Sequence, residues 1–331
     1  MNLILPMAGL GTRLRPHTWS KPKPLVPVGG KTVLGHFLDP LVSLPELNEV
    51  VLIIGYLGDQ VRDYMREQYP ELRVRYVVQE ELSGQSHAIW LAREGLDGPA
   101  LIGFVDTLIE TEFSVSGTEA AIWVREVDDP RRFGVVESDP GGRVRRLIEK
   151  PEDPPSNLAV VGFYYLEQVE RLIEAIEQQM EQGSKLKGEY FLADAINVLL
   201  DDGLSMKAIQ VGAWNDCGTA GAILSTNRYL LDHGRDNTET ALAGNGVIIE
   251  PPVYLDSTAS VSRCVIGPHV SIGPGCELER SSIRNSILDA DTEVRDSSLA
   301  NSLIGRNCTI LNTEGSLNIG DASEVRDGRS E

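Results

Sequence analysis

Positively charged side chains gather at the start of the chain, where they could bind a polyanion. Residues 1–38 hold five of them and no acidic residue: Arg13, Arg15, Lys21, Lys23 and Lys31. The rest of the chain has 25 basic and 49 acidic residues, and the whole chain has a formal charge of -19. A field of that sign repels nucleic acids and anionic membranes. A cationic segment in such a protein favours a small polyanion as ligand, although five charges alone also fit a chance cluster.

The residues around these cations favour phosphate as the polyanion. Residues 2–7 are apolar and precede a turn with small side chains at Ala8, Gly9 and Gly11. Backbone N–H groups of such a turn can reach phosphate oxygens without side-chain obstruction. The turn has no Gly-Lys-Ser/Thr ending of a Walker A loop, and Leu14 stands where a dinucleotide-binding loop needs its third glycine. Both of these loop classes are therefore set aside.

Two acidic residues elsewhere could hold a cation beside a phosphate. Asp106 follows the apolar run 101–105, and Asp216 lies in the sequence Trp-Asn-Asp-Cys-Gly-Thr. Ligands of α/β proteins bind beyond the carboxyl ends of the strands, where this run would place Asp106. A lone Asp at a strand end is more often a cap or turn residue. The role of Asp106 therefore depends on the wider pattern of the chain.

The first part of the chain alternates apolar runs with segments of helical periodicity. We expect strands at 2–7, 49–54, 74–78 and 101–105, and helices at 32–44, 57–68 and 84–95. This alternation predicts βαβ units and an α/β fold with a Rossmann-like, mostly parallel sheet. Further strands are expected at 120–127, 143–149 and 160–166, and further helices at 167–182, 190–201 and within 214–232.

The last hundred residues contain a single aromatic residue and many small aliphatic ones. The aliphatic residues recur near a six-residue step, as at Ile266, Ile272 and Leu278, and less regularly over 281–302. Such hexapeptide repeats predict a short left-handed parallel β-helix, which we place at 245–320. The alternative is a disordered tail rich in Ser and Asp, but disorder would not keep the aliphatic residues in phase.

The overall composition is that of a soluble protein. No apolar stretch approaches the roughly 20 residues of a membrane-spanning helix, and the first residues lack the features of a secretory signal. Four cysteines occur without Cys-x-x-Cys spacing, which argues against a disulfide scaffold or a zinc ribbon. We therefore expect a cytoplasmic protein.

The segment that follows the first strand resembles the sugar-1-phosphate nucleotidyltransferases, also called nucleoside-diphosphate-sugar pyrophosphorylases. It reads Gly-Leu-Gly-Thr-Arg-Leu-Arg-Pro-His-Thr and continues into Pro-Lys-Pro-Leu-Val-Pro-Val. The resemblance covers about residues 1–235, which we expect to form the nucleotidyltransferase domain. It implies that Arg13 holds the leaving pyrophosphate and that Lys23 meets the α-phosphate. It also implies that Asp106 and Asp216 are ligands of Mg²⁺.

The sequence departs from the family pattern at two positions. Ala8 replaces the more usual first glycine, a form also found in uridylyltransferases of the family. Val105 stands where the family usually has Gly before the strand-end Asp, and this leaves the carboxylate in place.

The resemblance also assigns residues that bind the two substrates. Six are expected to bind the nucleotide: Ala8, Gly9, Gly11, Thr12, Gln79 and Gly84. Five are expected to bind the sugar phosphate: Gly134, Glu149, Lys150, Gly162 and Glu189. A Gln in the base-reading loop suits uracil or thymine, because its amide can donate to O4 and accept from N3–H. Otherwise Gln79 is an exposed amide, and Glu149 and Lys150 form a surface ion pair of little energetic weight.

These assignments predict nucleotidyl transfer from dTTP or UTP to glucose-1-phosphate or a related hexose-1-phosphate, with release of pyrophosphate. One alternative is a bifunctional N-acetylglucosamine-1-phosphate uridylyl/acetyltransferase, whose β-helix should be much longer. A second is a non-catalytic regulatory subunit that binds sugar nucleotides, but such a chain would be free to lose the cationic and acidic positions retained here. Flat β-helix faces and exposed sheet edges favour a homo-oligomer.

Overall fold

The computed structural model describes residues 1–111, 113, 115, 117–183, 185–186, 188–238 and 246–327. Residue 245, the expected start of the β-helix, lies outside them. The chain divides into two compact units, each made of two chain segments. The first unit contains residues 1–9 and 37–214, and the second contains residues 10–36 and 215–331. The segment with Arg13 and Lys23 therefore belongs to the same unit as the C-terminal coils. The domain boundaries near 235 and 245 stay a prediction.

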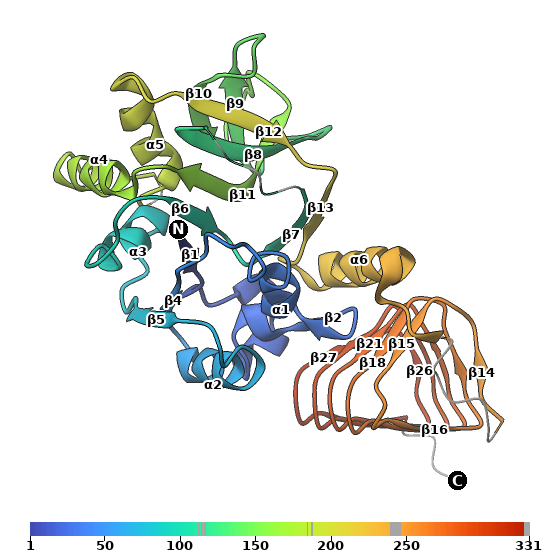
Figure 1. Ribbon diagram of the computed structural model, residues 1–331. Coiled ribbons are helices and arrows are strands. Elements are labelled where there is room, and N and C mark those ends of the chain that lie inside the picture. The colour runs from blue at the N-terminus through green and yellow to red at the C-terminus, as the bar shows by residue number, and fades with distance from the viewer. Residues whose placement is uncertain are drawn as a thin grey trace. The chain divides into compact units, whose positions relative to one another are not determined.

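The sheet of the first unit begins as a parallel βαβ arrangement (Figure 1). Its strands lie in the order β6-β1-β4-β5, and all three neighbouring pairs are parallel. They are β1 (Asn2–Pro6), β4 (Glu49–Ile54), β5 (Val74–Val78) and β6 (Ala100–Gly103). Five of the six residues of β4 are buried, as expected of a strand covered on both faces.

The second half of this sheet is mainly antiparallel, so the sheet as a whole is mixed. Strand β11 runs antiparallel to β6, β8 and β9, whereas β12 pairs in parallel with β8. The strands are β8 (Ala120–Glu126), β9 (Gly134–Ser138), β10 (Val144–Glu149), β11 (Leu158–Leu166) and β12 (Met206–Gln210). A short two-stranded sheet joins β7 (Thr107–Glu110) and β13 (Ala213–Asp216). The α/β fold is confirmed, but parallel pairing is less general than expected.

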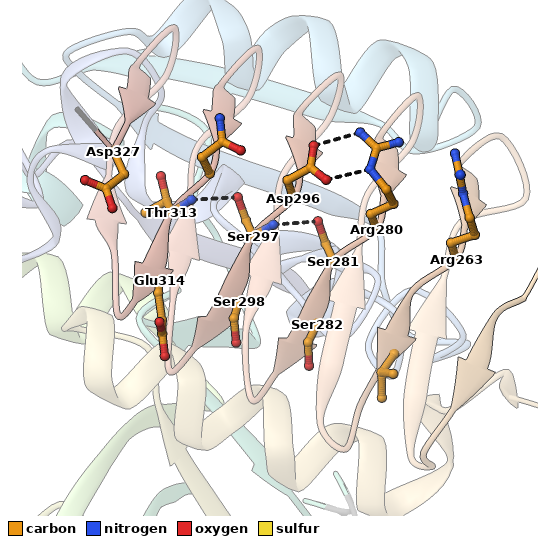
Figure 2. A pocket seen from close by; sticks show the side chains of 12 residues that line it. Arg263, Arg280, Ser281, Ser282, Asp296, Ser297, Ser298, Thr313, Glu314 and Asp327 are labelled. Atoms are coloured by element: carbon orange, nitrogen blue, oxygen red, sulfur yellow. Dashed lines mark hydrogen bonds and ion pairs between the residues drawn. The ribbon is translucent and has the colours of Figure 1, made fainter. Parts of the chain in front are cut away.

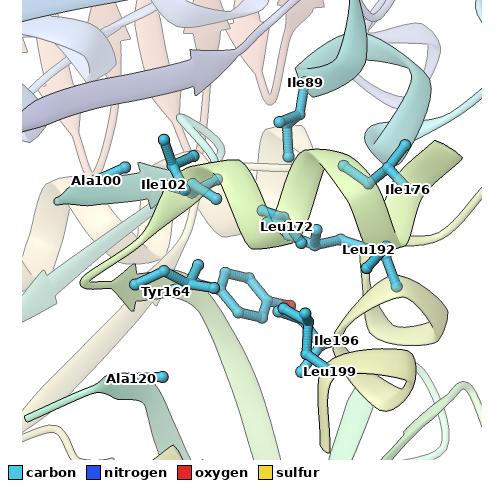
Figure 3. Packing of buried hydrophobic residues seen from close by; sticks show 14 of the residues in the cluster. Ile89, Ala100, Ile102, Ala120, Tyr164, Leu172, Ile176, Leu192, Ile196 and Leu199 are labelled. Atoms are coloured by element: carbon cyan, nitrogen blue, oxygen red, sulfur yellow. The ribbon is translucent and has the colours of Figure 1, made fainter. Parts of the chain in front are cut away.

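Helices pack on this sheet through apolar faces. They are α2 (Gly58–Gln68), α3 (Gln85–Leu91), α4 (Val169–Glu181) and α5 (Leu192–Asp201). Figure 3 shows Leu172 of α4 and Ile196 of α5 packed around Tyr164 of β11, in a buried hydrophobic cluster of this unit. Helix α1 (Val33–Leu38) is shorter than the expected 32–44. It ends before Pro40, because a proline disfavours helical geometry in the preceding residue.

The second unit begins with the loop that carries Arg13 and Lys23. It contains three 3₁₀ turns and a short hairpin: η1 (Thr12–Leu14), η2 (His17–Trp19), η3 (Lys23–Leu25), β2 (Pro27–Val28) and β3 (Lys31–Thr32). After the first unit the chain returns in helix α6 (Ala220–Leu230) and the π-helical turn η4 (Leu231–Arg235).

The C-terminal coils of this unit form a left-handed parallel β-helix with three sheets (Figure 1). The first sheet contains β14 (Ile248–Ile249), β17 (Val265–Ile266), β20 (Ser282–Arg284), β23 (Ser298–Ala300) and β26 (Glu314–Gly315). The second contains β15 (Val253–Leu255), β18 (Val270–Ile272), β21 (Ile287–Leu288), β24 (Leu303–Ile304) and β27 (Asn318–Ile319). The third contains β16 (Ser260–Ser262), β19 (Glu277–Glu279), β22 (Glu293–Arg295), β25 (Thr309–Leu311) and β28 (Glu324–Arg326).

The coils are shorter than three six-residue steps, which explains the irregular repeat over 281–302. Val265 pairs with Ser282, 17 residues later, whereas Leu278 pairs with Val294 after 16 residues. Residues in the left-handed backbone region turn the corners, among them Arg280, Asp296 and Asn312 with φ near 50°. Asn and Asp tolerate this region better than most residues. Coils of 16 or 17 residues therefore shift the six-residue step of the sequence, while the strands stay paired from coil to coil.

Serine and threonine side chains tie successive coils together next to these corners. The backbone N–H of Ser297 donates to Ser281 Oγ, and the N–H of Thr313 donates to Ser297 Oγ (Figure 2). Figure 2 also shows Arg280 paired with Asp296 of the next coil. Inside the coils lies a separate apolar cluster that includes Ile283. A search of the described residues for a helix long and apolar enough to cross a membrane finds none.

Candidate functional site

The loop after β1 folds tightly around Gly11. This glycine has φ of 60°, in the left-handed region that favours glycine. A Cβ atom here would lie 3.0 Å from Thr18 and 3.1 Å from Lys23 Cβ. The Thr18 hydroxyl donates to the Gly11 carbonyl over 2.8 Å. Gly11 therefore lets the turn bearing Thr12 and Arg13 pack directly against the residue that the family pattern assigns to the α-phosphate.

Arg13 and Asp216 both lie close to Gly218, a glycine that the sequence analysis did not single out. A Cβ atom on Gly218 would lie 2.8 Å from Asp216 Oδ1 and 3.1 Å from a guanidinium nitrogen of Arg13. Both side chains are exposed. Residues more than 200 positions apart thus present a cation and a carboxylate side by side within one unit.

The Trp-Asn-Asp-Cys-Gly-Thr segment holds Asp216 in this position by local hydrogen bonds. The N–H of Gly218 donates to Asp216 Oδ1 over 2.7 Å, and the hydroxyl of Thr226 donates to the Asp216 carbonyl over 2.8 Å. Thr219 caps α6, since its Oγ1 accepts from the N–H of Ala222. The carboxylate therefore belongs to the last residue of β13, three residues before the cap of α6.

Ala8 and Gly9 belong to the first unit and follow the end of β1. Ala8 is buried against Gly55, where an added Cβ atom would lie 2.9 Å from the Ala8 Cβ. The methyl group of Ala8 thus fits because residue 55 is a glycine. A Cβ atom added at Gly9 would meet nothing within 4 Å, so this backbone faces open space. Open backbone is what a phosphate-binding turn requires.

Asp106 follows a strand, as expected, but the strand ends before the predicted residue 105. Strand β6 ends at Gly103, and Asp106 stands in the turn before β7. Gly162 adjoins this turn, because its carbonyl accepts from the N–H of Phe104 over 3.0 Å. It has φ of 87° and sits at the register shift of β11 between Val160 and Tyr164. The bulge in β11 thus shapes the backbone next to Asp106.

The donor set fits a magnesium ion that also binds substrate. Among the described residues, no group of three or more His, Cys, Asp or Glu side chains could hold a metal ion. Mg²⁺ typically takes one or two carboxylates and completes its octahedral shell with water and substrate phosphates. Asp106 and Asp216 supply hard oxygen ligands of this kind, and one Asp216 oxygen is already oriented by the Gly218 N–H.

Gln79 is buried, in contrast to the exposed amide considered as its alternative. Its Nε2 donates to the Gly84 carbonyl over 3.2 Å and lies 3.3 Å from His87 Nδ1. Because Gly84 offers only a carbonyl, the amide nitrogen must face it. The amide oxygen then faces away from Gly84 and stays an acceptor.

Gly84 connects this loop to the segment expected to bind the sugar. It has φ of 106°, and a Cβ atom on it would lie 2.5 Å from both the nitrogen and the oxygen of Tyr190. Tyr190 in turn donates its N–H to Ser83 and accepts from the N–H of Ser86. The structure therefore brings Gly84 next to Glu189, and Tyr190 makes the connection that sequence reasoning missed.

The other predicted sugar-phosphate residues lie at one end of the β9–β10 hairpin. Gly134 pairs with Glu149, and a Cβ atom on it would lie 3.1 Å from Glu149 Oε2. Lys150 Nζ lies 3.0 Å from Glu149 Oε1 and 4.8 Å from the ring centre of Phe191. The glycine thus leaves room for the carboxylate, and the ion pair orients a half-exposed ammonium group.

One carboxyl of this region has a shifted pKa. Burial raises the pKa of Asp194, in the first turn of α5, while Arg146 acts in the opposite direction.

The structure places the residues of the predicted site in two sets, one in each unit. None of their predicted roles is tested by geometry alone, so the roles stay predictions.

Comparison with known proteins identifies the family. The nucleotidyl transferase family model matches residues 2–233, and the model of the GMPPB C-terminal domain matches residues 249–327. A similar curated relative is the bifunctional protein GlmU of Methanocaldococcus jannaschii. It is 30% identical over 331 residues, which cover 93% of this chain and 78% of that protein.

Two further matches extend the comparison. The glucose-1-phosphate thymidylyltransferase of Streptomyces antibioticus is 29% identical, with 98% of this chain and 99% of that protein covered. A crystal structure of UDP-glucose pyrophosphorylase complexed with UDP-glucose aligns with a TM-score of 0.62 at 22% identity, over 70% of this chain and 98% of that chain. This structural match supports the fold. The family model and the relatives confirm the resemblance found in the sequence, and the chain belongs to the nucleotidyl transferase family, among the sugar-1-phosphate nucleotidyltransferases.

Proposed function

We propose that this nucleotidyltransferase transfers a pyrimidine nucleotide from dTTP or UTP to glucose-1-phosphate or a closely related hexose-1-phosphate. The observation that carries the proposal is the meeting of Arg13 and Asp216 beside Gly218. A guanidinium group next to a carboxylate offers one ligand for a polyphosphate and one for its metal ion. A regulatory subunit without catalysis would not need both in one place.

The reaction requires charge neutralisation more than proton transfer. An oxygen of the sugar phosphate attacks the α-phosphorus of the nucleotide, and the bond from that phosphorus to pyrophosphate breaks. The nucleophile is already anionic, so no protein base has to take a proton. Preorganised cations stabilise the charge that builds up on the non-bridging and leaving oxygens. We assign Arg13 to the pyrophosphate, Lys23 to the α-phosphate and Lys150 to the sugar phosphate.

Magnesium completes the set of positive charges. When bound, it neutralises phosphate charge and holds the triphosphate in a reactive conformation. We assign Asp106 and Asp216 as its protein ligands. The orienting Gly218 N–H keeps one oxygen of Asp216 in a fixed direction.

The preference for a pyrimidine rests on Gln79. Its amide nitrogen is held by the Gly84 carbonyl, which leaves the oxygen as acceptor for a base N–H. The N3–H of uracil or thymine is such a donor, whereas N1 of adenine is an acceptor. Guanine also has an N1–H donor, so this contact by itself discriminates against adenine and not against guanine. A relative over nearly the whole chain is named a glucose-1-phosphate thymidylyltransferase, which agrees with this choice of base and sugar.

A substrate panel tests this function. The purified chain is incubated with Mg²⁺, glucose-1-phosphate and one of dTTP, UTP, GTP or ATP, and pyrophosphate release is measured. We expect turnover with dTTP or UTP, and the product is a nucleoside-diphosphate glucose. Turnover with purine nucleotides alone, or with none of the four, would contradict the proposal. Consumption of acetyl-CoA with glucosamine-1-phosphate would instead indicate the alternative of a bifunctional uridylyl/acetyltransferase.

We also infer self-association of the chain. Its β-helix presents two sheets, β14 to β26 and β16 to β28, whose outward residues include the half-exposed to exposed side chains Ile248, Arg284 and Glu293. Light scattering at micromolar concentration should give at least twice the 36.2 kDa of one chain. A monomer mass over this range would remove the inference.

A further inference from the structure

Lys21 lies in the same loop as Lys23 but points away from solvent into an acidic cluster of the β-helix. The side chain of Lys21 is only 7% exposed. Its ammonium group donates to Asp289 and lies 3.8 Å from Asp321 Oδ1. The two carboxylates follow strands β21 and β27 of the second β-helix sheet and are themselves largely buried, at 15% and 9% exposure. A lysine so enclosed is not available to bind a substrate phosphate.

Further contacts of the same loop surround this cluster. The Ser20 hydroxyl donates to Asp321 Oδ2 over 2.8 Å, and Arg306 donates to the same oxygen over 2.7 Å. His17 Nε2 lies 2.7 Å from the amide oxygen of Asn318. Three residues of the loop thus bind side chains from two coils of the β-helix, those of β21 and β27. We call this set of contacts the Lys21 anchor.

A second set of contacts holds the loop a few residues further on. The N–H of Gly29 donates to Asn227 Oδ1 over 2.9 Å, and Ser271 Oγ donates to the same oxygen over 2.7 Å. Asn227 is fully buried, and its Nδ2 donates to the His269 carbonyl. Gly30 lies directly against the ring of Tyr254, with no room for a Cβ atom.

Lys23 therefore lies between two fixed points, at residues 21 and 29. Its own segment is the single 3₁₀ turn η3, with the N–H of Leu25 bonded to Pro22 and that of Val26 bonded to Lys23. Isolated 3₁₀ turns have weak hydrogen-bond geometry and do not persist alone. The tertiary contacts at both sides of the turn therefore help to fix the position of Lys23, together with its packing against Gly11.

Buried ion pairs give position more than stability. Their mutual attraction offsets the cost of removing both groups from water only when the geometry is well defined. The Lys21 ammonium contacts Asp289 and Asp321, which belong to the β21 and β27 coils on either side of the β24 coil. Coils of a parallel β-helix are fixed relative to one another by their backbone ladder, here β21–β24–β27. The stack thus serves as a rigid support.

We propose that Lys21 is a positioning residue, through which Asp289 and Asp321 of the β-helix fix the loop that carries Lys23 and Arg13. The β-helix is then part of the machinery for nucleotidyl transfer, although it supplies no group that touches the substrates. This inference rests on the proposed function, because the loop matters for catalysis only if it holds the triphosphate.

Two variants separate positioning from stability. Lys21→Met keeps the length of the side chain but leaves Asp289 buried without its cation, so it loses stability as well as the link. The double variant Lys21→Met/Asp289→Asn removes both charges, while Asp321 keeps Arg306 as partner. Lys207→Met, at an exposed position of β12, is the matched control.

We expect the double variant to unfold at the denaturant concentration of the wild type, yet to have kcat reduced on the order of 100-fold. A misplacement of about 1 Å at a catalytic group is enough for such a loss. KM for the hexose-1-phosphate should change less than about threefold, since its binding residues lie elsewhere. Recovery of kcat together with stability in the double variant would overturn the proposal.

Hydrogen exchange measures the protection of the loop amides in the absence of substrate. In the double variant the amides of Leu25 and Val26 should exchange faster than in the wild type, while those of the β-helix core stay protected. Unchanged exchange at both amides would contradict the anchor. If the wild type released no pyrophosphate with any substrate pair, the proposed function would fail, whereas the exchange result would still decide whether Lys21 holds the loop.

Discussion

The two units place their candidate site residues by different physical means. In the first unit, loops at strand ends are joined through their backbones, as where Tyr190 exchanges hydrogen bonds with Ser83 and Ser86 around Gly84. In the second unit, side chains join a loop to a stack of coils, as where Lys21 meets Asp289. Backbone contacts depend on glycine and on turn geometry, whereas the Lys21 anchor depends on buried charge.

This difference shows that neighbouring cations of one motif can have opposite roles. Lys21 and Lys23 are two residues apart and carry the same charge, but Lys21 is enclosed by carboxylates. The family pattern marks Lys23, and only the structure shows what Lys21 binds. Substitutions in each unit should therefore separate loss of a substrate contact from loss of support.

The largest expected effect is on the free energy of unfolding, and one substitution in each of the two apolar cores tests it. Leu288 lies inside the β-helix beside Asp289, and Leu172 lies in the core of the first unit; both are nearly or fully buried. Replacing either by Ala should lower the free energy of unfolding by about 2–5 kcal/mol. Only Leu288→Ala should also speed exchange at the Val26 amide, because it loosens the coil that holds Lys21. Equal exchange at Val26 in both variants would show that the loop does not depend on the coils.

The next effect concerns residues assigned to the triphosphate. Lys23→Ala and Asp216→Asn should each lower kcat about 10²–10³-fold, as is typical when one preorganised contact to developing charge is lost. Unfolding midpoints should stay close to that of the wild type. The controls are Lys207→Ala and Asp291→Asn, two exposed positions outside the candidate site. Near-normal turnover in both Lys23→Ala and Asp216→Asn would reject these roles.

A smaller effect is expected from the base-binding loop of the first unit. Gln79→Glu places a carboxylate oxygen against the Gly84 carbonyl, where the amide nitrogen now donates. Loss of a buried hydrogen bond with two facing acceptors should lower kcat/KM for dTTP or UTP by about 10–100-fold. Steady-state kinetics with all four nucleotides measures this change. An unchanged nucleotide preference would show that Gln79 does not choose the base.

The smallest effect is the pH dependence of the Lys21 anchor. Burial lowers the pKa of His17, and Lys21 adds to this, although Asn318 and nearby carboxylates act in the opposite direction. Below pH 6.5 the unfolded chain therefore binds a proton at His17 more readily than the folded chain. The free energy of unfolding should fall as pH decreases, by at most about 1.4 kcal/mol per pH unit from this group.

Denaturant titrations at pH 7 and pH 5.5 test that dependence. His17→Gln should flatten it, while His233→Gln, at an exposed position, should leave it unchanged. A steeper fall of stability in His17→Gln than in the wild type would contradict the assignment.

Periodicity and composition predicted most of the fold. The strands at 49–54 and 74–78 have the expected bounds. The first is a continuous apolar run after Glu49, and such runs define buried strands clearly. The mixed direction of the sheet could not be predicted in the same way, because a strand such as β11 has the same residues whichever direction it runs. The β-helix was predicted from the regular spacing of its aliphatic residues. Its shortened corners were not predicted, because they use residues in the left-handed backbone region such as Arg263 and His269, whose types do not point to a corner.

The sequence predicted only those residues of the candidate site that lie within a recognisable motif. Arg13 and Asp216 were assigned from the sequence, and the structure brings them together beside Gly218. Asp106 was expected directly after a strand that ends at residue 105, but β6 stops at Gly103, so a short turn separates Asp106 from the strand. The anchoring role of Lys21 left no sequence signal, since its partners are more than 250 residues away.

A double-mutant cycle on Arg13 and Asp216 tests the central claim most directly. Arg13→Ala, Asp216→Asn and the double variant are compared with the wild type for kcat/KM of pyrophosphate release. If both residues act on one metal-bound triphosphate, the account predicts strong non-additivity, with the double variant little slower than the slower single variant. Multiplication of the two single losses would show that the residues act independently and would contradict the account.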